Sequence, residues 1–336
     1  SRKSMDILQV AKRARVSSAT VSRVLNGSDL VRPATSERVR RAIAELNYVR
    51  NPNARSLRLG RTRLFGLIVS DIKNPFFPDL IDAFEGMAAE QGIDVIFTHT
   101  NYDTTRLRSC IRRMVERGVE GIAIMTSEMD EEALRQVPVR GIATVLLNQP
   151  ALQEKYRNVA VEYSEGFLEA LKHLQSLGHR EIGFIAGPST FSSALRRRES
   201  WETAMKQLRL PIRPGRVVVG DMRVEGGANA MKGILAGGNR PTAVLATNDL
   251  MAIGALHAAV SAGIRIPKEM SLCGFDDLPV CSMVVPQLTT IQLPRYEIAA
   301  HAFEALLQAV RGEKQTPCAA VYPRLVIRKS TGPVAK

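Results

Sequence analysis

Residues 10–26 read VAKRARVSSATVSRVLN, and this stretch decides how the first part of the chain folds. Apolar residues recur at helical spacing from Ile7 to Ala14, which predicts a short helix with one apolar face. Arg15 interrupts that pattern. A second helix can begin at Ser17, because a serine side chain accepts a hydrogen bond from the backbone N–H groups of a helix's first turn.

The second helix has two different faces. Val21, Val24 and Leu25 are expected to pack inward. The side chains expected on the outside are Ser18, Ala19, Ser22 and Arg23. A third helix is predicted to begin near Thr35 or Ser36. Three short helices, the first two joined by a tight turn, are typical of a helix-turn-helix, whose second helix enters the major groove of DNA.

The positive charge of the chain is concentrated at its beginning. The whole chain has a formal net charge of +13. Residues 1–61 contain 14 Lys and Arg against 4 Asp and Glu, whereas the remaining 275 residues contain 32 against 29. A basic domain binds a phosphate backbone by displacing its counterions. The distribution therefore favours a polyanion-binding module over a solvated basic surface or a localisation tail.

After residue 63 the sequence alternates short apolar runs with helical stretches. The first series of apolar runs is LFGLIVSDI, DVIFTHT, GIAIMT and ATVLLN, and the second is EIGFIAG, RVVVGD, AVLATN and MSLCGFD. Repeated strand–helix units predict parallel sheets covered by helices on both faces. Two series predict two doubly wound lobes. The later segments QLTTIQLPRYEIAAHAFEALLQAV and RLVIRKS are expected to return the chain to each lobe.

Composition and motifs argue against an enzyme, a membrane protein or a metalloprotein. No apolar run approaches the roughly 20 residues that span a bilayer. The four cysteines form no CxxC pair, and the five histidines lack metal-ligand spacing. No phosphate-binding loop or nucleophile elbow is present, and no cofactor is expected. Because no signal-peptide pattern opens the sequence, we expect a cytoplasmic protein.

The quoted stretch, together with ERVRRAIAELNYVRNPNARSLR at residues 37–58, resembles the headpiece of the lactose-repressor/galactose-repressor (LacI/GalR) family of bacterial transcriptional regulators. SLGHREIGFIAGP, TAVLATNDLMAIGAL, IPKEMSLCGFDD and PQLTTI resemble the core of that family. The resemblance runs from about Met5 to Thr331. It implies a small all-α helix-turn-helix headpiece and an α/β core of two doubly wound lobes, like a type I periplasmic binding protein.

The resemblance also implies how the chain divides. The expected parts are a DNA-binding headpiece over residues 1–50, a hinge helix or linker over 51–62, and an effector-binding and dimerisation core over 63–336. Within the core, lobe 1 is expected over about 63–162 and 294–322, and lobe 2 over about 163–293 and 323–334.

DNA contacts follow from the family positions and from the small exposed side chains of the second helix. Ser18, Ala19 and Arg23 are expected at base edges, where an arginine can pair with guanine. The residues expected at phosphates, where contacts position the protein without specifying sequence, are Ser17, Thr20, Ser22 and Asn26.

In the family, the segment matching residues 51–62 is a hinge helix that folds when the dimer meets its operator. Leu57 matches the leucine that wedges into the minor groove, a device that kinks the duplex. The expected hinge residues are Ala54, Arg55, Leu57 and Arg58. The alternative is an ordinary linker in which Leu57 packs against the next domain.

A ligand in such a core lies between the lobes, at the carboxyl ends of the strands. The expected effector-binding residues, from family positions and strand ends, are Asp71, Phe76, Asn148, Arg197, Asn248 and Asp276. Asn and Asp at strand ends also cap helices, which is the alternative for this set. Met222 stands where some relatives have an aromatic residue, and Arg197 lies in a run of three arginines. The ligand class therefore stays open between a sugar, a sugar acid and a similar metabolite.

These expectations describe a sequence-specific transcriptional regulator, a repressor by family default, controlled by a small molecule. Because one recognition helix reads only a half-site, we expect a homodimer on a pseudo-palindromic operator. Two alternatives stay open. One is a helix-turn-helix regulator without effector control, and the other is a sugar-binding protein without a regulatory role.

Overall fold

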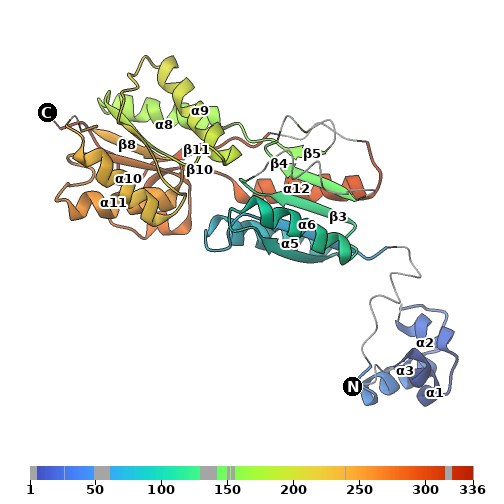
Figure 1. The fold of residues 1–336 in the computed structure, drawn as a ribbon. Coiled ribbons are helices and arrows are strands. Elements are labelled where there is room, and N and C mark those ends of the chain that lie inside the picture. The colour runs from blue at the N-terminus through green and yellow to red at the C-terminus, as the bar shows by residue number, and fades with distance from the viewer. Residues whose placement is uncertain are drawn as a thin grey trace. The chain divides into compact units, whose positions relative to one another are not determined.

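The computed structural model describes residues 6–25, 27–48, 61–128, 142–149, 152, 156–238, 240–314 and 320–335. Contacts within the chain divide it into two compact units, one ending at Thr62 and one beginning at Arg63. We call them the DNA-binding unit and the core (Figure 1). The residues expected to form the hinge, and Asn26, lie outside the described residues.

The DNA-binding unit is a bundle of three helices, α1 (Ile7–Ala14), α2 (Ser18–Leu25) and α3 (Pro33–Glu45). Val10, Val21 and Val39, one from each helix, are fully buried and form its centre. Arg15, which ends α1, adopts a left-handed backbone with φ of 52°. The hydroxyl of Ser17 accepts from the backbone N–H of Thr20 at 3.2 Å, so Ser17 caps α2 as expected.

Two expectations for this unit are wrong in detail. Ser22 was expected on the outside of α2, but it is buried, with only 9% of its surface exposed. Helix α3 begins at Pro33 rather than near Thr35. Proline suits a first helical position, because the N–H group that it lacks would have no partner within the helix there and because its φ is already helical.

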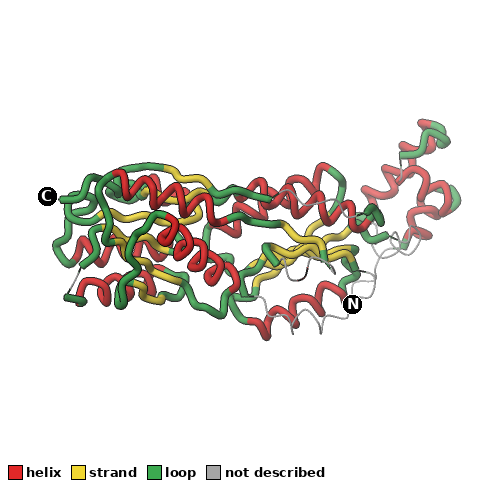
Figure 2. The backbone as a smooth tube through the Cα atoms, turned by 90° about the horizontal axis from the view of Figure 1, so that it is seen from above, coloured by secondary structure: helices red, strands yellow, loops and turns green. Residues whose placement is uncertain are grey.

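Lobe 1 of the core is built on a five-stranded parallel sheet with strand order β2-β1-β3-β4-β5. Its strands are β1 (Leu64–Val69), β2 (Asp94–His99), β3 (Gly121–Met125), β4 (Ala143–Leu147) and β5 (Arg157–Val159). Its helices include α5 (Phe76–Glu90), α6 (Thr104–Glu116) and, from much later in the chain, α12 (Arg295–Val310). Figure 2 shows helices on both faces of the strands.

Successive side chains of the lobe 1 strands enter different layers, because a strand points them alternately to its two faces. On β1, Leu67 belongs to the apolar cluster that contains Phe84 of α5 and Phe303 of α12. Its neighbour Ile68 belongs to a separate cluster that contains Ile111 of α6. Both faces of the sheet are therefore buried, which explains the nearly continuous apolar runs in the sequence.

Lobe 2 is built on a six-stranded sheet with order β11-β10-β9-β8-β6-β7, in which only the β10–β11 pair is antiparallel. Its strands are β6 (Ile182–Ala186), β7 (Val217–Val219), β8 (Ala243–Ala246), β9 (Ser271–Asp276), β10 (Thr289–Gln292) and β11 (Arg324–Val326). Its helices are α8 (Tyr163–Ser176), α9 (Ser192–Gln207), α10 (Val224–Ala236), α11 (Asp249–Ser261) and the short 3-10 helix η2 (Pro279–Ser282).

Helices α10 and α11 pack closely because glycines lie at their contact. A Cβ added to Gly254 would lie 1.9 Å from the carbonyl oxygen of Val224, and one added to Gly227 would lie 2.1 Å from that of Met251. Neither approach is possible for a residue with a side chain. The two glycines thus fix the separation of these helices.

The chain crosses between the lobes repeatedly. Strand β10 lies in the sheet of lobe 2, the following helix α12 packs against α5 of lobe 1, and β11 returns to lobe 2. The C-terminal residues are held by His179, which is 1% exposed and whose Nε2 lies 2.9 Å from the carbonyl oxygen of Gly332. Among the described residues, no helix is long and apolar enough to cross a membrane.

Candidate DNA-reading helix and effector cavity

The surface of α2 offers small and cationic side chains to a partner. Ala19 and Arg23 are exposed and Ser18 is half-buried, so all three of the residues expected at base edges are at least partly accessible. Ser17 is exposed, and its hydroxyl lies 2.9 Å from the hydroxyl of Thr20. Ser22 is buried and does not share this surface.

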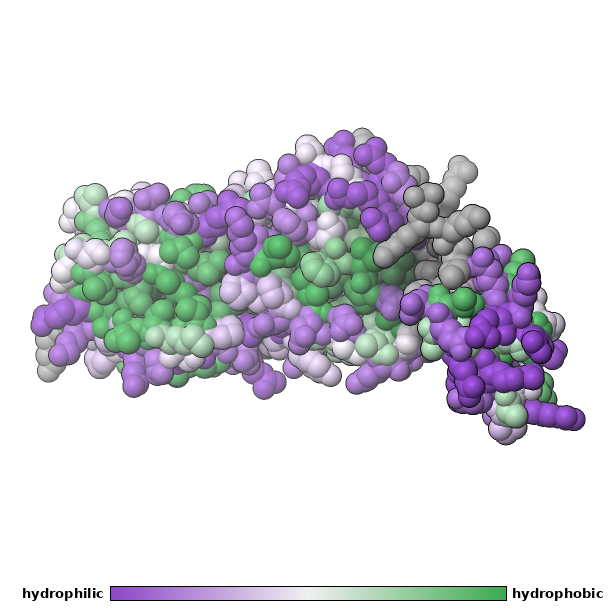
Figure 3. Space-filling model, turned by 90° about the horizontal axis from the view of Figure 1, so that it is seen from below, coloured by the Kyte–Doolittle hydropathy of each residue, from purple (hydrophilic) through white to green (hydrophobic). Residues whose placement is uncertain are grey.

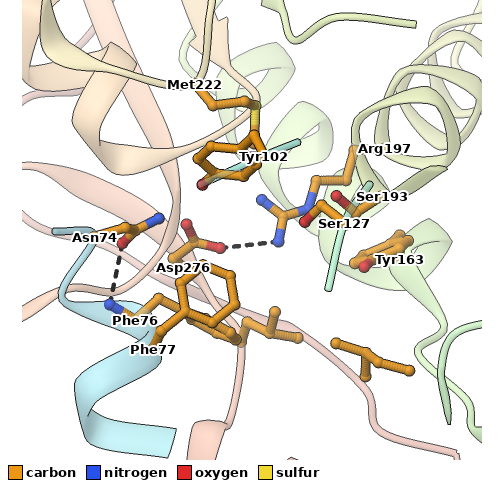
Figure 4. Close-up of a pocket in the computed structure, with 12 residues that line it drawn as sticks. Asn74, Phe76, Phe77, Tyr102, Ser127, Tyr163, Ser193, Arg197, Met222 and Asp276 are labelled. Carbon is orange, nitrogen blue, oxygen red and sulfur yellow. Dashed lines mark hydrogen bonds and ion pairs between the residues drawn. The ribbon is translucent and has the colours of Figure 1, made fainter. Parts of the chain in front are cut away.

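A cavity lies between the two lobes of the core, where the carboxyl ends of the two sets of strands meet (Figure 4). Lobe 1 and the segment that leads into α12 contribute Asn74, Phe76, Phe77, Tyr102, Ser127, Leu147 and Leu293 to its lining, and lobe 2 contributes Tyr163, Ser193, Arg197, Met222 and Asp276. We call it the effector cavity. Most of this lining is apolar or aromatic, with a few polar groups that converge on the centre, which is the composition of a small-molecule site.

An ion pair lies at the centre of the effector cavity. Nη2 of Arg197 donates to Oδ1 of Asp276 at 2.9 Å, and its Nη1 donates to the carbonyl oxygen of Thr247 at 2.8 Å. The guanidinium also lies over the ring of Phe275, 4.1 Å from its centre. Burial opposes the charge of Arg197, but Asp276 and Tyr163 favour it, and its pKa lies above the usual value.

The backbone that carries Asp276 is strained. Asp276 has a φ of 118° and Asp277 a φ of 58°, values that residues with side chains rarely adopt. Arg295 holds this turn, because its Nη1 donates to the carbonyl oxygens of both residues at 3.0 Å. Such strain persists where the surrounding contacts over-determine it, and it clusters at ligand-binding sites.

Asp249 of α11 lies behind the ion pair and is fully buried. Its Oδ1 accepts from the hydroxyl of Thr290 at 2.5 Å and its Oδ2 from the N–H of Leu278 at 2.8 Å. Burial and, after it, the charge of Asp276 raise the pKa of Asp249 to about 7. The carboxyl group of Asp249, whose pKa is raised, thus contacts the segment that follows the turn carrying Asp276.

Several buried polar atoms at the strand ends and on α9 have no hydrogen-bond partner within the described protein. They are Nε of Arg197, Oγ of Ser193, Nδ2 of Asn148 and the hydroxyls of Thr126 and Thr247. A buried polar atom without a partner is unfavourable by about 1–3 kcal/mol. Arg197 and Ser193 line the effector cavity, so a polar ligand there can supply the missing partners.

Side chains of the two lobes also meet directly beside the effector cavity. Arg223 of lobe 2 donates to Oδ1 of Asn101 at 3.1 Å and lies 3.7 Å from the carboxylate of Asp71, both in lobe 1. The rings of Tyr102 and Phe191 stack with their centres 5.1 Å apart. Of these residues, Tyr102 also lines the cavity.

The structure brings together three of the six residues expected at the effector. Phe76, Arg197 and Asp276 line the cavity, whereas Asp71, Asn148 and Asn248 are not in its lining. Asn248 caps α11 by accepting from the N–H of Met251 at 2.9 Å, and its amide donates to the carbonyl oxygen of Met222 at 2.9 Å. The side chain of Asn248 therefore caps a helix, which is the alternative given above for this set of residues.

The remaining two expected residues also make local contacts. Oδ1 of Asp71 accepts from the N–H of Lys73 at 3.0 Å, and Oδ1 of Asn148 accepts from the N–H of Val161 at 3.4 Å. Tyr102, Ser127, Tyr163 and Ser193 line the cavity but were not expected there. They lie just after strands or at helix starts, and only the strand-end position of Tyr102 and Ser127 gave a signal in the sequence.

Comparisons with known proteins agree with this arrangement. Residues 6–51 match the family described as bacterial regulatory proteins, lacI family, and residues 171–331 match the periplasmic binding protein-like domain. The HTH-type transcriptional repressor PurR of Pasteurella multocida (strain Pm70) is 33% identical over 327 residues, covering 96% of this chain and 98% of that protein. The chain belongs to the lacI family of bacterial regulatory proteins. It is thus a DNA-binding transcriptional regulator with an effector-binding core, not an enzyme.

Solved structures of lacI-family proteins have the same fold. A lac repressor dimer bound to operator and the anti-inducer ONPF superposes with a TM-score of 0.89 at 27% identity, covering 98% of this chain and 100% of that chain. A complex of the transcriptional regulator CelR with cellobiose gives a TM-score of 0.73 at 27% identity, with 97% and 99% coverage. The expected fold, a helix-turn-helix followed by two doubly wound lobes, is confirmed.

Within the described residues, no group of three or more His, Cys, Asp or Glu side chains is arranged to hold a metal ion. The polar groups of the effector cavity are a guanidinium, a carboxylate, hydroxyls and an amide. This set can donate to and accept from a hydroxylated or amide-bearing molecule.

Proposed function

We propose that the chain represses transcription by placing α2 in the major groove of a pseudo-palindromic operator. Ser18 and Ala19 read base edges through a hydroxyl and a methyl group, and Arg23 pairs with a guanine. The accessibility of these three side chains supports this assignment. Ser17 and Thr20 contact phosphates. Ser22 is buried in α2 and has no role at the DNA in this proposal.

The hinge proposal rests on the sequence alone. Residues 51–62 form a hinge whose Leu57 wedges into the minor groove, flanked by Ala54, Arg55 and Arg58, and Asn26 contacts a phosphate. Leu57→Ala is expected to weaken binding to the operator far more than binding to bulk DNA. Equal losses on both would show that Leu57 is not a wedge.

The effector is a small hydroxylated molecule, a sugar or a similar metabolite, bound in the cavity around Arg197 and Asp276. The charge of Arg197 is already balanced by Asp276, so a neutral ligand suits the site better than a sugar acid does. Crystallised lacI-family relatives hold related molecules: cellobiose in CelR, and ribose in a regulator from Enterococcus faecium. Asp71 and Asn148 act by shaping the loops around the cavity, and Asn248 by capping α11.

The protein acts as a homodimer in the cytoplasm. One α2 reads only a half-site, so specificity requires two copies related by a two-fold axis. Figure 3 shows apolar surface extending over both lobes on the face it presents. Exposed apolar side chains of the core include Phe97, Val260, Met283 and Val285. A lac repressor relative has been crystallised as a dimer on its operator.

Control works through two states of the dimer. Effector binding between the lobes changes their relative angle, and the angle sets the spacing of the two hinge segments. The contacts of Arg223 with Asn101 and Asp71 belong to the closed arrangement. Coupling between two such sites is typically about 1–3 kcal/mol. The domain limits that go with this mechanism are residues 1–50, 51–62 and 63–336.

The observation that carries the proposal is the buried ion pair of Arg197 and Asp276 in a cavity between two lobes, on a chain that begins with a helix-turn-helix. The test is a selection of bound sites from random duplex DNA by the full chain, with and without a metabolite extract. A two-fold symmetric site whose enrichment changes with the extract is expected.

The alternatives predict different results. A regulator without effector control selects the same site, and no extract fraction changes that selection. A bound ligand would raise the thermal midpoint of unfolding, so for such a regulator no fraction should shift that midpoint. A sugar-binding protein without a regulatory role selects no site at all.

A further inference from the structure

Helix α6 of lobe 1 carries an unusual concentration of positive charge. The helix and the residue that ends it contain Arg106, Arg108, Arg112, Arg113 and Arg117, against the single carboxylate of Glu116. All five arginines are exposed. Their net contribution of +4 is larger than the +3 of the whole stretch from residue 62 to residue 336, so the rest of that stretch is slightly negative. The rest of residues 62–336 therefore contributes no net positive charge.

Local stabilisation explains only part of this charge. Cations in the last turn of a helix interact favourably with its dipole, which accounts for Arg113 and Arg117. Arg106 and Arg108 lie near the other end, where the dipole disfavours a cation. Among the described residues, no carboxylate lies within ion-pair distance of Arg106, Arg108, Arg112 or Arg117.

Helix α6 ends at the edge of lobe 1 where the chain enters the core. Arg117 ends the helix, and three residues later the N–H of Glu120 donates to the carbonyl oxygen of Leu64 at 2.8 Å. The N–H of Arg63 donates to Oε1 of Glu120 at 2.9 Å. Arg117, at the end of α6, thus lies three residues from the segment that meets the start of the core at Arg63 and Leu64.

We propose that the arginines of α6 bind the phosphate backbone of duplex DNA beside the operator, without reading its sequence. Negative phosphates complement this surface, and their contacts release counterions. Because the DNA-binding unit is joined to the core by a short segment, DNA held by that unit is present at high effective concentration for lobe 1. Contacts that are individually weak then add to binding. This inference rests on the DNA-binding function proposed above.

The experiment compares how strongly salt weakens binding to a short and a long duplex. Both contain the operator obtained by site selection, one in about 20 base pairs and one in about 60 with arbitrary flanks. The full chain is compared with a variant carrying Arg112→Gln, Arg113→Gln and Arg117→Gln. On the long duplex, the slope of log K against log salt is expected to become shallower by about 1–3 in the variant. On the short duplex the slopes are expected to agree.

Two further variants separate charge from structure. Lys172→Gln, Lys206→Gln and Lys232→Gln remove three exposed cations from lobe 2 and are expected to leave both slopes unchanged. Arg112→Lys, Arg113→Lys and Arg117→Lys retain the charge and are expected to restore the slope on the long duplex. A variant that loses affinity through misfolding would lose it on both duplexes.

An unchanged slope on the long duplex in the α6 glutamine variant overturns the inference, as does an equal change in the lobe 2 variant. Failure of the proposed function gives a different result, because the unmodified chain would then select no operator. A chain that selects its operator and shows no dependence on α6 binds DNA through the DNA-binding unit alone.

Discussion

Arg223 of lobe 2 and Asn101 of lobe 1 are joined by a hydrogen bond of 3.1 Å, although 122 positions separate them in the chain. The same guanidinium lies 5.8 Å from the centre of the Tyr102 ring. These contacts link the loop after β2 to the start of α10. They join the two lobes directly in this structure.

Arg223→Ala is expected to make opening of the lobes easier. Because 44% of the Arg223 side chain is exposed, water screens its contacts, and the effect is limited to about 0.5–1 kcal/mol. Hydrogen exchange at residues 100–102 and 221–224 should therefore accelerate about two- to five-fold. Arg180→Ala, at an exposed position in lobe 2, is the control and should change neither segment.

Arg197→Met is expected to lower the free energy of unfolding by about 3–5 kcal/mol, because it leaves the carboxylate of Asp276 buried without a partner. Adding Asp276→Asn removes that charge and should recover part of the loss. Chemical denaturation of both single variants and the double variant measures the coupling. Strictly additive losses would show that the ion pair contributes nothing to stability.

Arg23→Ala is expected to relax the sequence preference of the chain rather than to weaken all DNA binding equally. A guanidinium paired with guanine contributes about 1–3 kcal/mol of discrimination at one base pair. Site selection with this variant should lose the preference at one position in each half-site. An unchanged selected site would place Arg23 away from the bases.

Gly254→Ala is expected to destabilise the core by about 1–3 kcal/mol or more, because the new Cβ would overlap the carbonyl oxygen of Val224 and force α10 and α11 apart. Gly233 provides a matched control on α10, since nothing lies within 4 Å of its added Cβ. Gly233→Ala should instead stabilise by about 0.5–1 kcal/mol. Thermal or chemical unfolding of the two variants should therefore shift in opposite directions.

Asp249 is expected to make the stability of the core depend on pH. Its pKa is raised to about 7 in the folded chain, against about 3.9 for an ordinary aspartate when unfolded. The folded state holds a proton that the unfolded state has lost, so this contribution to stability is complete below about pH 4 and disappears as the pH rises through about 7. The free energy of unfolding is expected to fall by at most about 1.4 kcal/mol per pH unit because of this group.

The check is the difference in unfolding free energy between the unmodified chain and Asp249→Asn from pH 5 to pH 8. The difference should shrink as the pH rises. The neighbouring charged groups are Asp276 and Arg197, together with Asp277 and Arg328, and they are the same in both proteins. A difference that is constant with pH would show that Asp249 is ionised throughout.

Periodic features of the sequence predicted the fold well. Runs such as those of β1 and β3 are apolar on both faces because helices cover both sides of the sheet, so they were recognisable as strands. The burial of individual polar residues was harder to predict. Ser22 is buried although its side chain is polar, and nothing in the sequence pattern signals that burial.

The effector cavity was only partly predictable for a related reason. Phe76, Arg197 and Asp276 were identified from family positions and strand ends. Asn248 matches a family position equally well, but the backbone N–H of Met251 and the carbonyl of Met222 occupy its side chain. Tyr102 and Tyr163 reach the cavity because two lobes fold toward each other, which depends on contacts between distant segments and not on local pattern.

The interleaved path of the chain has a consequence for protein synthesis. The DNA-binding unit ends at Thr62 and can fold once that residue has been made, whereas lobe 1 includes α12 and lobe 2 includes β11, which follow much later in the chain. A message truncated anywhere between these points would yield a folded reading head attached to two unfinished lobes. Such a product would lack parts of both effector-binding lobes, and because one α2 reads only a half-site, it would bind DNA without the specificity that a dimer provides.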